Sequence, residues 1–262
     1  YFIQFVHTRP EITLEDNTFC NFNNSGVSYN DILTIFLSDG REYAINYINC
    51  SFINITNDKD YGGVIRHTYS AKINLNFLDC LFYRNQCVEH IGGALYIKIE
   101  KDILISNCTF QDNYALSMSS AIYIDCKNSS LLINIIDCDF LNNTSNPNYI
   151  NYNIYITGGN AIIQNCSIIY EVSSSSGGGV NLGSECFTVE NCNFSKLSCI
   201  TLSFYQINES ADQSILKNCT FYDCFGYCDN MVIKLEFKSI LGLDFFNCSF
   251  KNFWRLRESK LN

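Results

Sequence analysis

The chain is poor in proline, in charge and in long apolar runs, and each shortage excludes a class of protein. Only 2 of its 262 residues are proline and 14 are glycine, so it is not a proline- and glycine-rich linker. Acidic side chains number 26 against 17 basic ones, which leaves no basic stripe to neutralise phosphates. No apolar run approaches the roughly 18 residues of a membrane helix. We therefore expect neither a nucleic-acid partner nor a transmembrane segment.

Apolar side chains are plentiful. They make up 47% of the chain, and 15% of the residues are aromatic, which is enough to build a packed core and excludes disorder. The chain begins at Tyr1, and its first ten residues lack the cationic region of a signal peptide. We expect a mature protein or a fragment of a longer one.

Cysteine reveals an internal repeat. Nine cysteines recur every 26 to 30 residues, and phenylalanine follows two residues later in all cases except Ile168. Asn or Asp precedes eight of the nine, with Phe19 as the exception. Regularity of this kind predicts repeated structural units. The nine are Cys20, Cys50, Cys80, Cys108, Cys138, Cys166, Cys192, Cys219 and Cys248.

Each repeat contains three short stretches rich in strand-forming residues, divided by turn-like residues. A unit this short buries its apolar face only by stacking on its neighbours. The sequence therefore predicts an all-β fold: a right-handed parallel β-helix solenoid of about nine coils, with three short strands per coil. One domain spans residues 1–262, with a partial first coil at 1–11 and a candidate C-terminal cap at 251–262. We expect further coils upstream in a longer chain.

Side-chain alternation places the repeated Cys and Phe on the same side of a strand. Because one is small and the other large, we expect both to form ladders inside the solenoid. The residue three before each Cys from Cys50 to Cys248 is also apolar, and its parity conflicts with that of Cys. The chain must therefore bend at the intervening Asn, which tolerates the left-handed conformation, and stacked amides can hydrogen-bond between coils.

Two short motifs point to a known family. An F-x-x-N pattern appears in Phe82–Asn85 and Phe110–Asn113, and a G-G-A-I-like pattern in Gly92–Leu95. Together they resemble the repeats of chlamydial polymorphic outer membrane proteins and related large surface proteins of some protists, within the pectin-lyase-like β-helix group. The coils after Cys192, Cys219 and Cys248 lack F-x-x-N. The resemblance implies the β-helix fold and a secreted passenger or adhesin-like surface region.

Cysteine usage gives two expectations. Equivalent cysteines on adjacent coils have parallel side chains about 4.8 Å apart, which is too far for an easy disulfide, so we expect reduced core thiols. Cysteines that break the repeat are better disulfide candidates. The hypothesis is a bridge from Cys199 to Cys224 or Cys228.

N-x-S/T sequons number twelve, which exceeds chance and fits a glycosylated secreted protein. Some of them are by-products of the Asn-Cys-Ser/Thr repeat. The expected location is extracellular or at the cell surface. The expected acceptors, which lie away from the bend before each Cys, are Asn23, Asn54, Asn128, Asn142 and Asn208.

The sequence offers little for catalysis. Enzymes of this fold need clustered carboxylates or a base beside metal-binding acids, and acids do not recur at outward positions of neighbouring coils. The three histidines, His7, His67 and His90, fall on different coils, and no Cys-x-x-Cys pair or phosphate-binding loop is present. We expect no catalytic residue, no cofactor and no metal.

One outward row is a candidate binding surface. Tyr96, Tyr123 and Tyr155 point outward on three successive coils, where they could bind sugars or a partner strand or loop. The alternative is that they only cover the sheet or pack under a loop. The other members of the row are Arg66, Asn181, Thr201 and Lys234.

The leading functional expectation is a non-enzymatic secreted or cell-surface β-helix that serves adhesion or acts as a structural rod. Its partners would be host or neighbouring surface glycans or proteins, further coils of the same chain, or neighbouring subunits. Two alternatives stay open: a carbohydrate-binding or polysaccharide-degrading pectin-lyase-like enzyme, and a structural subunit of an extracellular filament or coat.

Overall fold

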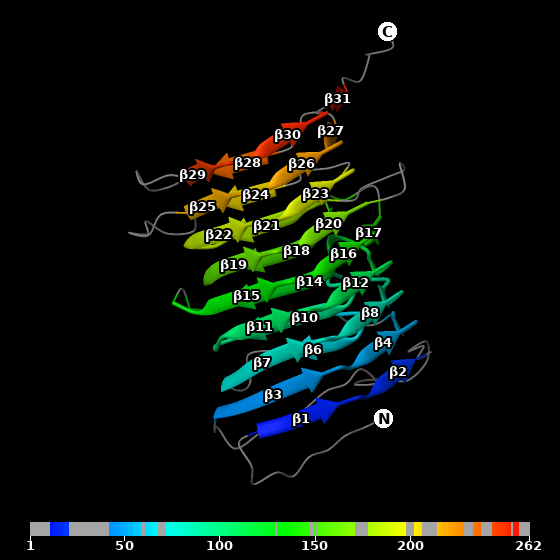
Figure 1. Ribbon diagram of the computed structural model, residues 1–262. Helices are drawn as coiled ribbons and strands as arrows, with labels where there is room; N and C mark the ends of the chain where they lie inside the picture. The colour runs from blue at the N-terminus through cyan, green and yellow to red at the C-terminus, as the bar shows by residue number, and fades with distance from the viewer. Residues whose placement is uncertain are drawn as a thin grey trace.

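The computed structural model describes residues 11–20, 42–58, 61–67, 72–128, 130–146, 149, 151–170, 178–197, 202–205, 214–227, 233–236, 243–252 and 254–256. Within these residues every regular element is a β-strand, and each strand pairs in parallel with the equivalent strand of the next coil. Figure 1 shows the coils stacked from the N-terminal end to the C-terminal end. The all-β parallel solenoid predicted from the repeat is confirmed.

Three sheets run along the solenoid, and two smaller ones accompany them. The first sheet contains β1 (Glu11–Glu15), β3 (Glu42–Ile48), β7 (Lys72–Leu78), β11 (Ile103–Ser106), β15 (Leu132–Ile136), β19 (Asn160–Gln164), β22 (Cys186–Glu190), β25 (Ser214–Lys217) and β29 (Leu243–Phe246). The second contains β2 (Thr18–Cys20), β4 (Ser51–Ile53), β8 (Leu81–Tyr83), β12 (Thr109–Gln111), β16 (Asp139–Leu141), β20 (Ser167–Ile169), β23 (Asn193–Ser195), β26 (Thr220–Tyr222) and β30 (Ser249–Lys251).

The third sheet contains β6 (Ile65–His67), β10 (Leu95–Ile99), β14 (Met118–Cys126), β18 (Asn151–Thr157), β21 (Val180–Gly183), β24 (Leu202–Tyr205) and β28 (Ile233–Glu236). The small sheets contain β5 (Thr56–Asn57), β9 (Gln86–Cys87), β13 (Tyr114–Ala115) and β17 (Thr144–Ser145), and β27 (Phe225–Tyr227) with β31 (Trp254–Leu256). The first two sheets have nine strands each and the third has seven, so fewer than nine coils show all three strands in the described residues.

The phenylalanines form the stacked core that the repeat predicts. Phe82 and Phe110 lie 4.6 Å apart between ring centroids and are 2° from parallel, and Phe110 stacks on Phe140 at 5.0 Å. Ile168 fills the next position and is fully buried. Face-to-face stacking at the coil spacing follows from the parallel register, because equivalent side chains lie directly above one another. The core is therefore one continuous column.

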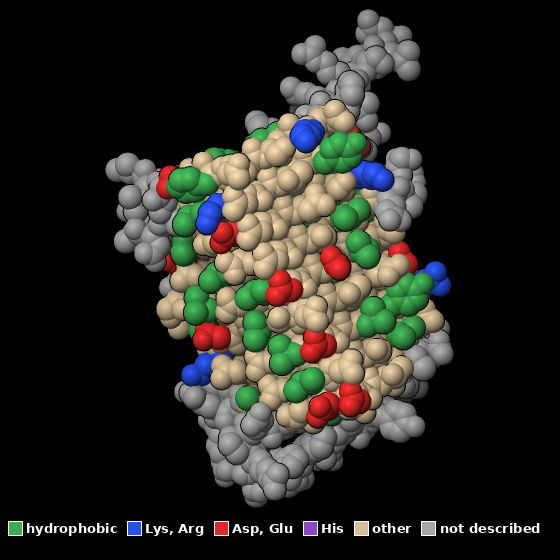
Figure 2. Space-filling view, viewed as in Figure 1, with side chains coloured by type: hydrophobic (Ala, Val, Ile, Leu, Met, Phe, Trp, Pro, Cys, Tyr) green, Lys and Arg blue, Asp and Glu red, His purple; other side chains and the backbone are tan. Residues whose placement is uncertain are grey.

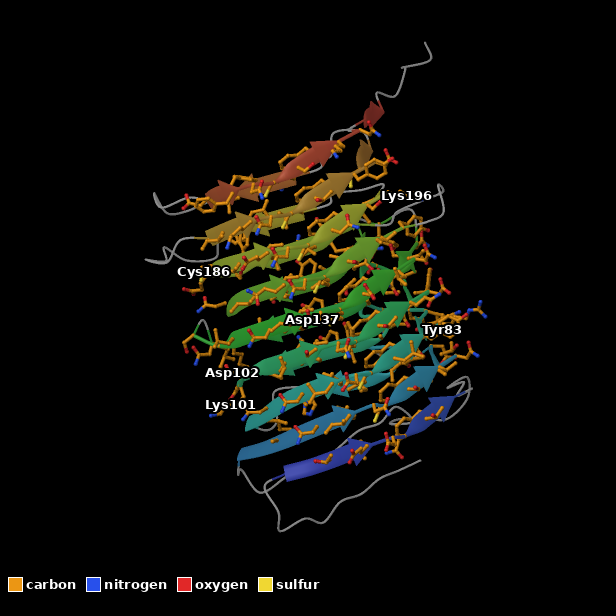
Figure 3. The ribbon with its side chains drawn as sticks, viewed as in Figure 1. Tyr83, Lys101, Asp102, Asp137, Cys186 and Lys196 are labelled. Atoms are coloured by element: carbon orange, nitrogen blue, oxygen red, sulfur yellow. The ribbon has the colours of Figure 1, made fainter. Side chains whose placement is uncertain are left out.

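The bend at the residue before each Cys is also confirmed. The residues before the eight cysteines from Cys50 to Cys248, and Asp16 before Asn17 on the first coil, have φ between 49° and 57°. A second left-handed bend follows four residues after Cys, between the second and the small sheet, and the sequence did not predict it. Arg84 and Lys196 adopt it despite their unfavourable side chains, and Lys196 lies at the outer edge of the second sheet (Figure 3).

The cysteines cap backbone carbonyls that these bends leave inside. The thiol of Cys138 lies 3.1 Å from the carbonyl oxygen of Ile136 and 3.6 Å from that of Ile105 on the preceding coil. The other described ladder cysteines, from Cys50 to Cys248, make the same two contacts. A buried thiol is a weak donor and a small apolar side chain, so Cys suits a tight bend that must satisfy carbonyls.

The assignment of Cys20 to this ladder is wrong. Phe19, rather than Phe22, pairs with Phe52 and stacks on its ring at 5.0 Å. In this register Asn17 occupies the ladder position of the first coil. Its amide donates to the carbonyl of Glu15, two residues earlier, at 2.8 Å, and the ladder thiols make the equivalent contact on later coils. The first coil is therefore longer than the repeat suggests, and the even spacing of Cys20 is a coincidence.

The F-x-x-N motif has a structural role. Asn113 is fully buried, its amide donates to the Phe82 carbonyl at 3.0 Å, and its oxygen accepts the backbone N–H of Asn85 at 3.0 Å. Asn85 and Asn143 hold their preceding coils in the same way. Each buried amide thus satisfies two backbone groups at the second bend.

The paired glycines permit a close approach between coils. Gly92 has φ of +79°, and a Cβ on Gly93 would lie 2.0 Å from the carbonyl oxygen of Ser120. On the next coil Ser119 and Ser120 replace the pair, and the register between β14 and β18 shifts there. Like F-x-x-N, the motif reflects packing.

Charged side chains do not gather on the face formed by the first and second sheets. Figure 2 shows them singly or in pairs among hydrophobic side chains, uncharged polar side chains and backbone. At the C-terminal end, β31 pairs with β27, so the expected cap includes a strand. Residues 257–262 and 1–10 lie outside the described residues.

Candidate functional site: an outward tyrosine column

Four tyrosines form one column on the outer face of the third sheet. Tyr96, Tyr123 and Tyr155 occupy equivalent positions of β10, β14 and β18, as predicted. Their rings stack at 5.0 Å and 5.4 Å. Tyr61 adds a fourth ring, 4.7 Å from Tyr96. We call these four residues the tyrosine column.

The two ends of the column differ in exposure. Tyr96 is only 4% exposed, because Tyr61 stacks on it and His90 stacks in turn on Tyr61 at 4.4 Å. Tyr123 and Tyr155 are half-buried. Tyr96 is therefore covered by neighbouring side chains, as the alternative to a binding surface predicted, whereas Tyr123 and Tyr155 reach the surface.

Polar side chains flank the column on the same face. Lys98 and Asp125 form an ion pair of 3.4 Å, and the Thr157 hydroxyl donates to Asp125 at 3.2 Å. The Lys98 ammonium also lies 5.6 Å from the centre of the Tyr96 ring. A hydrogen bond to Tyr96 and the pairing with Asp125 raise the pKa of Lys98, so it stays charged.

The exposed phenols remain neutral at ordinary pH. Burial raises the pKa of Tyr123 to about 12, and it also raises the pKa of Tyr155. A neutral phenol both donates and accepts a hydrogen bond. The surface thus offers two phenol hydroxyls, an ammonium, a carboxylate and a threonine hydroxyl on one rigid sheet.

The rest of the predicted row is placed with one correction. Arg66 pairs with Tyr96, and Asn181 pairs with Tyr155. The next position belongs to Ser203 rather than Thr201, and Ser203 pairs in turn with Lys234. Thr201 lies outside the described residues. The residue predicted from the spacing differs by two positions from the one in register, because β24 follows a connection of irregular length.

The predicted modification sites are only partly described. Asn54 and Asn128 are exposed and Asn142 is half-buried, whereas Asn23 and Asn208 lie outside the described residues. Cys224 is buried, with its thiol 3.5 Å from the carbonyl oxygens of Phe194 and Tyr222. Cys199 and Cys228 lie outside the described residues, so the proposed bridge stays a prediction.

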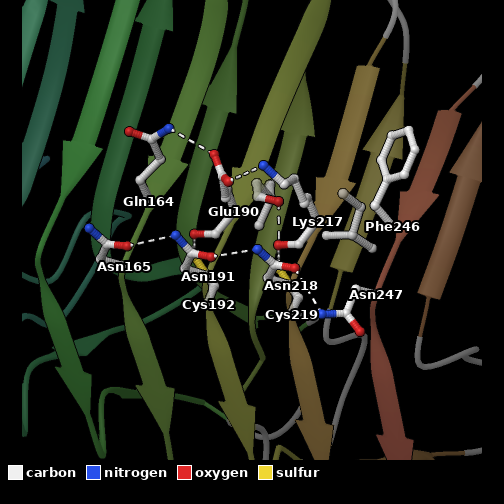
Figure 4. A network of polar contacts seen from close by, with 12 residues as sticks. Gln164, Asn165, Glu190, Asn191, Cys192, Lys217, Asn218, Cys219, Phe246 and Asn247 are labelled. Atoms are coloured by element: carbon white, nitrogen blue, oxygen red, sulfur yellow. Dashed lines mark hydrogen bonds and ion pairs between the residues drawn. The ribbon is translucent and has the colours of Figure 1, made fainter.

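A second regular feature is the amide ladder at the first bend, which lies along the middle of the face that contains Asp137 in Figure 3. Asn165 donates to Asp137 at 2.9 Å, and each later amide donates to the one before it (Figure 4). The later distances are 3.1, 3.0 and 3.1 Å, through Asn191, Asn218 and Asn247. The predicted hydrogen bonding between stacked amides is confirmed.

The described part of the chain contains no metal site of three or more ligands and no membrane-spanning helix. No group of three or more His, Cys, Asp or Glu side chains there could hold a metal ion. None of the described residues forms a helix that could cross a membrane. His7 lies outside the described residues, and His67 is buried in the third sheet.

Comparison with protein families, with curated proteins and with solved structures gives no match for this chain. The chain is therefore classed by its architecture, a parallel β-solenoid.

Proposed function

We propose that this chain is a non-enzymatic secreted or cell-surface β-solenoid that acts by contact, through the exposed end of the tyrosine column. The observation that carries the proposal is the fixed array of Tyr123, Tyr155, Lys98, Asp125 and Thr157 on one sheet. Such an array is rigid, because strands paired on both sides hold its backbone. The sequon-rich exterior supports the extracellular location.

The chemistry of the array favours a glycan as partner. Ring faces within the column are occupied by neighbouring rings, so a partner meets ring edges and phenol hydroxyls. Sugar hydroxyls both donate and accept hydrogen bonds, which matches neutral phenols beside an ammonium and a carboxylate. A glycan chain that runs along the solenoid axis would meet equivalent groups about every 4.8 Å.

Binding to immobilised glycans tests the proposal. We expect the purified chain to bind a subset of neutral or acidic glycans, and Tyr123→Ala with Tyr155→Ala to weaken that binding at least about tenfold, or 1.4 kcal/mol. Tyr222→Ala is the matched control, because Tyr222 is 40% exposed on the second sheet, away from the column. Equal binding by both variants would contradict the proposed surface.

The enzyme alternative has its own test. The Lys98–Asp125 pair contributes one carboxylate, whereas hydrolysis of the two-carboxylate type needs a second. We expect no release of reducing ends or unsaturated products from acidic polysaccharides. Turnover that Asp125→Asn abolishes and Asp139→Asn preserves would overturn the non-enzymatic assignment.

A further inference from the structure

A row of thiols runs along the inside of the solenoid. Binding of glycans at the surface would not require these thiols. Eight described cysteines occupy the same position of successive coils, all are free thiols, and all but Cys248 are buried. We call them the cysteine ladder. Its members are Cys50, Cys80, Cys108, Cys138, Cys166, Cys192, Cys219 and Cys248.

Successive thiols of the ladder stack above one another along the axis. The backbone N–H of Cys80 donates to the sulfur of Cys108 at 3.4 Å, and that of Cys108 donates to the sulfur of Cys138 at 3.5 Å. Each thiol also lies close to a carbonyl oxygen of the preceding coil. Because equivalent side chains point the same way, the sulfur atoms repeat at about the coil spacing of 4.8 Å.

This spacing suits a bridging ion better than a disulfide. A disulfide needs its sulfur atoms about 2.05 Å apart, which would require the coils to distort. A bond between sulfur and a metal ion is about 2.3 Å long, so a linear S–metal–S unit spans about 4.6 Å. Soft thiolates select Cu(I) and Zn(II). Zn(II) prefers four tetrahedral ligands, whereas monovalent Cu(I) and Ag(I) readily take two ligands in a line.

We propose that adjacent thiols of the cysteine ladder bind thiophilic monovalent ions of the Cu(I) class, in linear two-coordinate sites. On binding, one thiol of each pair releases its proton to solvent, and the ion bonds to that thiolate and to the sulfur of the neighbouring thiol. The resulting unit is uncharged, which a dry core tolerates far better than an ion. The released proton costs that thiol its hydrogen bond to a carbonyl.

The stoichiometry follows from the bonding at sulfur. A thiol sulfur that bonded two ions in one line would need a straight angle between them, whereas its lone pairs favour a bent one. Each sulfur therefore serves one ion. The eight ladder thiols hold at most four ions, in pairs of neighbouring coils such as Cys108 with Cys138.

Silver(I) is the redox-inert probe for this class of ion. We expect the reduced full chain to take up Ag(I), to protect ladder thiols from alkylation in neighbouring pairs, and to lose one bound ion by native mass spectrometry in the double variant Cys108→Ser with Cys138→Ser. Cys87→Ala is the control, because Cys87 is buried in β9 outside the ladder. It should leave the protection of the ladder unchanged.

Three results would overturn the proposal: ladder thiols that alkylate equally with and without Ag(I), an ion count that the double variant does not lower, or X-ray absorption showing more than two sulfur ligands. The absorption measurement uses the wild-type chain, so it decides the matter even where the double variant fails to fold. Two collinear sulfur ligands and no nitrogen or oxygen ligand would support the sites.

Discussion

At the scale of single residues, the bends and their hydrogen bonds decide which side chains the repeat accepts. Asn recurs before Cys because it tolerates a positive φ and because its amide continues the outer ladder. Cys recurs because its thiol fits inside the bend and caps two carbonyls. Residues that depart from these roles therefore mark places where stability can be gained or lost.

Tyr47 is one such departure, since its hydroxyl is buried in the core without a hydrogen-bond partner. Its ring stacks on Phe77 at 4.8 Å, so phenylalanine already occupies the equivalent position of the next coil. We expect Tyr47→Phe to raise the free energy of unfolding by about 1 kcal/mol, because an unsatisfied buried hydroxyl is removed. Urea unfolding measures it. Tyr155→Phe is the control and should change stability by less than about 0.5 kcal/mol.

Asp137 is a second departure, because a carboxylate has no hydrogen to donate to Asn107 on the preceding coil. Asp137 accepts a hydrogen bond from Asn165, but the amide ladder is interrupted between Asp137 and Asn107. We expect Asp137→Asn to complete the ladder and to stabilise the fold by less than about 1 kcal/mol. Asp139→Asn, with the same charge change on β16, should not. A loss of thermal stability in Asp137→Asn would contradict the ladder's role.

Buried thiols predict sensitivity to alkali. Burial raises the pKa of Cys87 from 9.0 to about 12, so the unfolded chain loses this proton first. The stability that the protonated thiol contributes is complete below pH 9, and it falls by about 1.4 kcal/mol per pH unit between pH 9 and 12. Urea unfolding should therefore show the advantage of wild type over Cys87→Ala shrinking above pH 9. An advantage that stays constant up to pH 11 would contradict this burial.

At the scale of elements, the F-x-x-N and paired-glycine motifs hold one coil against the next. Buried Asn113 satisfies the second bend of the preceding coil, and Gly93 allows the carbonyl of Ser120 to approach. Sequence alone located the strands of the three long sheets, their inward residues and the first bend, because period-2 alternation and the repeated Asn-Cys-x-Phe encode them directly. It did not predict the two small sheets.

The remaining features depend on register, which spacing does not determine. Cys20 has the right spacing but the wrong register, because the first coil is longer and Asn17 takes the ladder position. Ser203 replaces Thr201 in the outer row for a similar reason. The coverage of Tyr96 by Tyr61 and His90 depends on a connection that has no repeat pattern. One signal was available for the first coil, since Asp16-Asn17-Thr18-Phe19 matches the repeat with Asn in place of Cys.

Gly93 tests the packing between coils. A Cβ at this position would meet a backbone oxygen that cannot rotate away. We expect Gly93→Ala to lower the free energy of unfolding by about 1–3 kcal/mol, as overpacked sites do. Chemical denaturation measures the loss. A neutral substitution would mean that the third sheet yields at this position and that the glycine pair is not a packing requirement.

At the scale of the whole molecule, the ladders make a stiff rod with one distinctive surface. The amide ladder outside, the thiol and phenylalanine ladders inside and the tyrosine column all follow the same axis. Such a rod presents groups at fixed intervals, which suits contact with another repeating molecule. This geometry supports the surface role that we propose.

The most direct test of that role is to map glycopeptides and free thiols by mass spectrometry on protein purified from the cells that make it. The account predicts N-glycans at one or more of Asn54, Asn128 and Asn142, together with reduced ladder thiols such as Cys138. A protein without glycans at any sequon would contradict the secreted location that we propose, and ladder thiols joined as disulfides would contradict the reduced core.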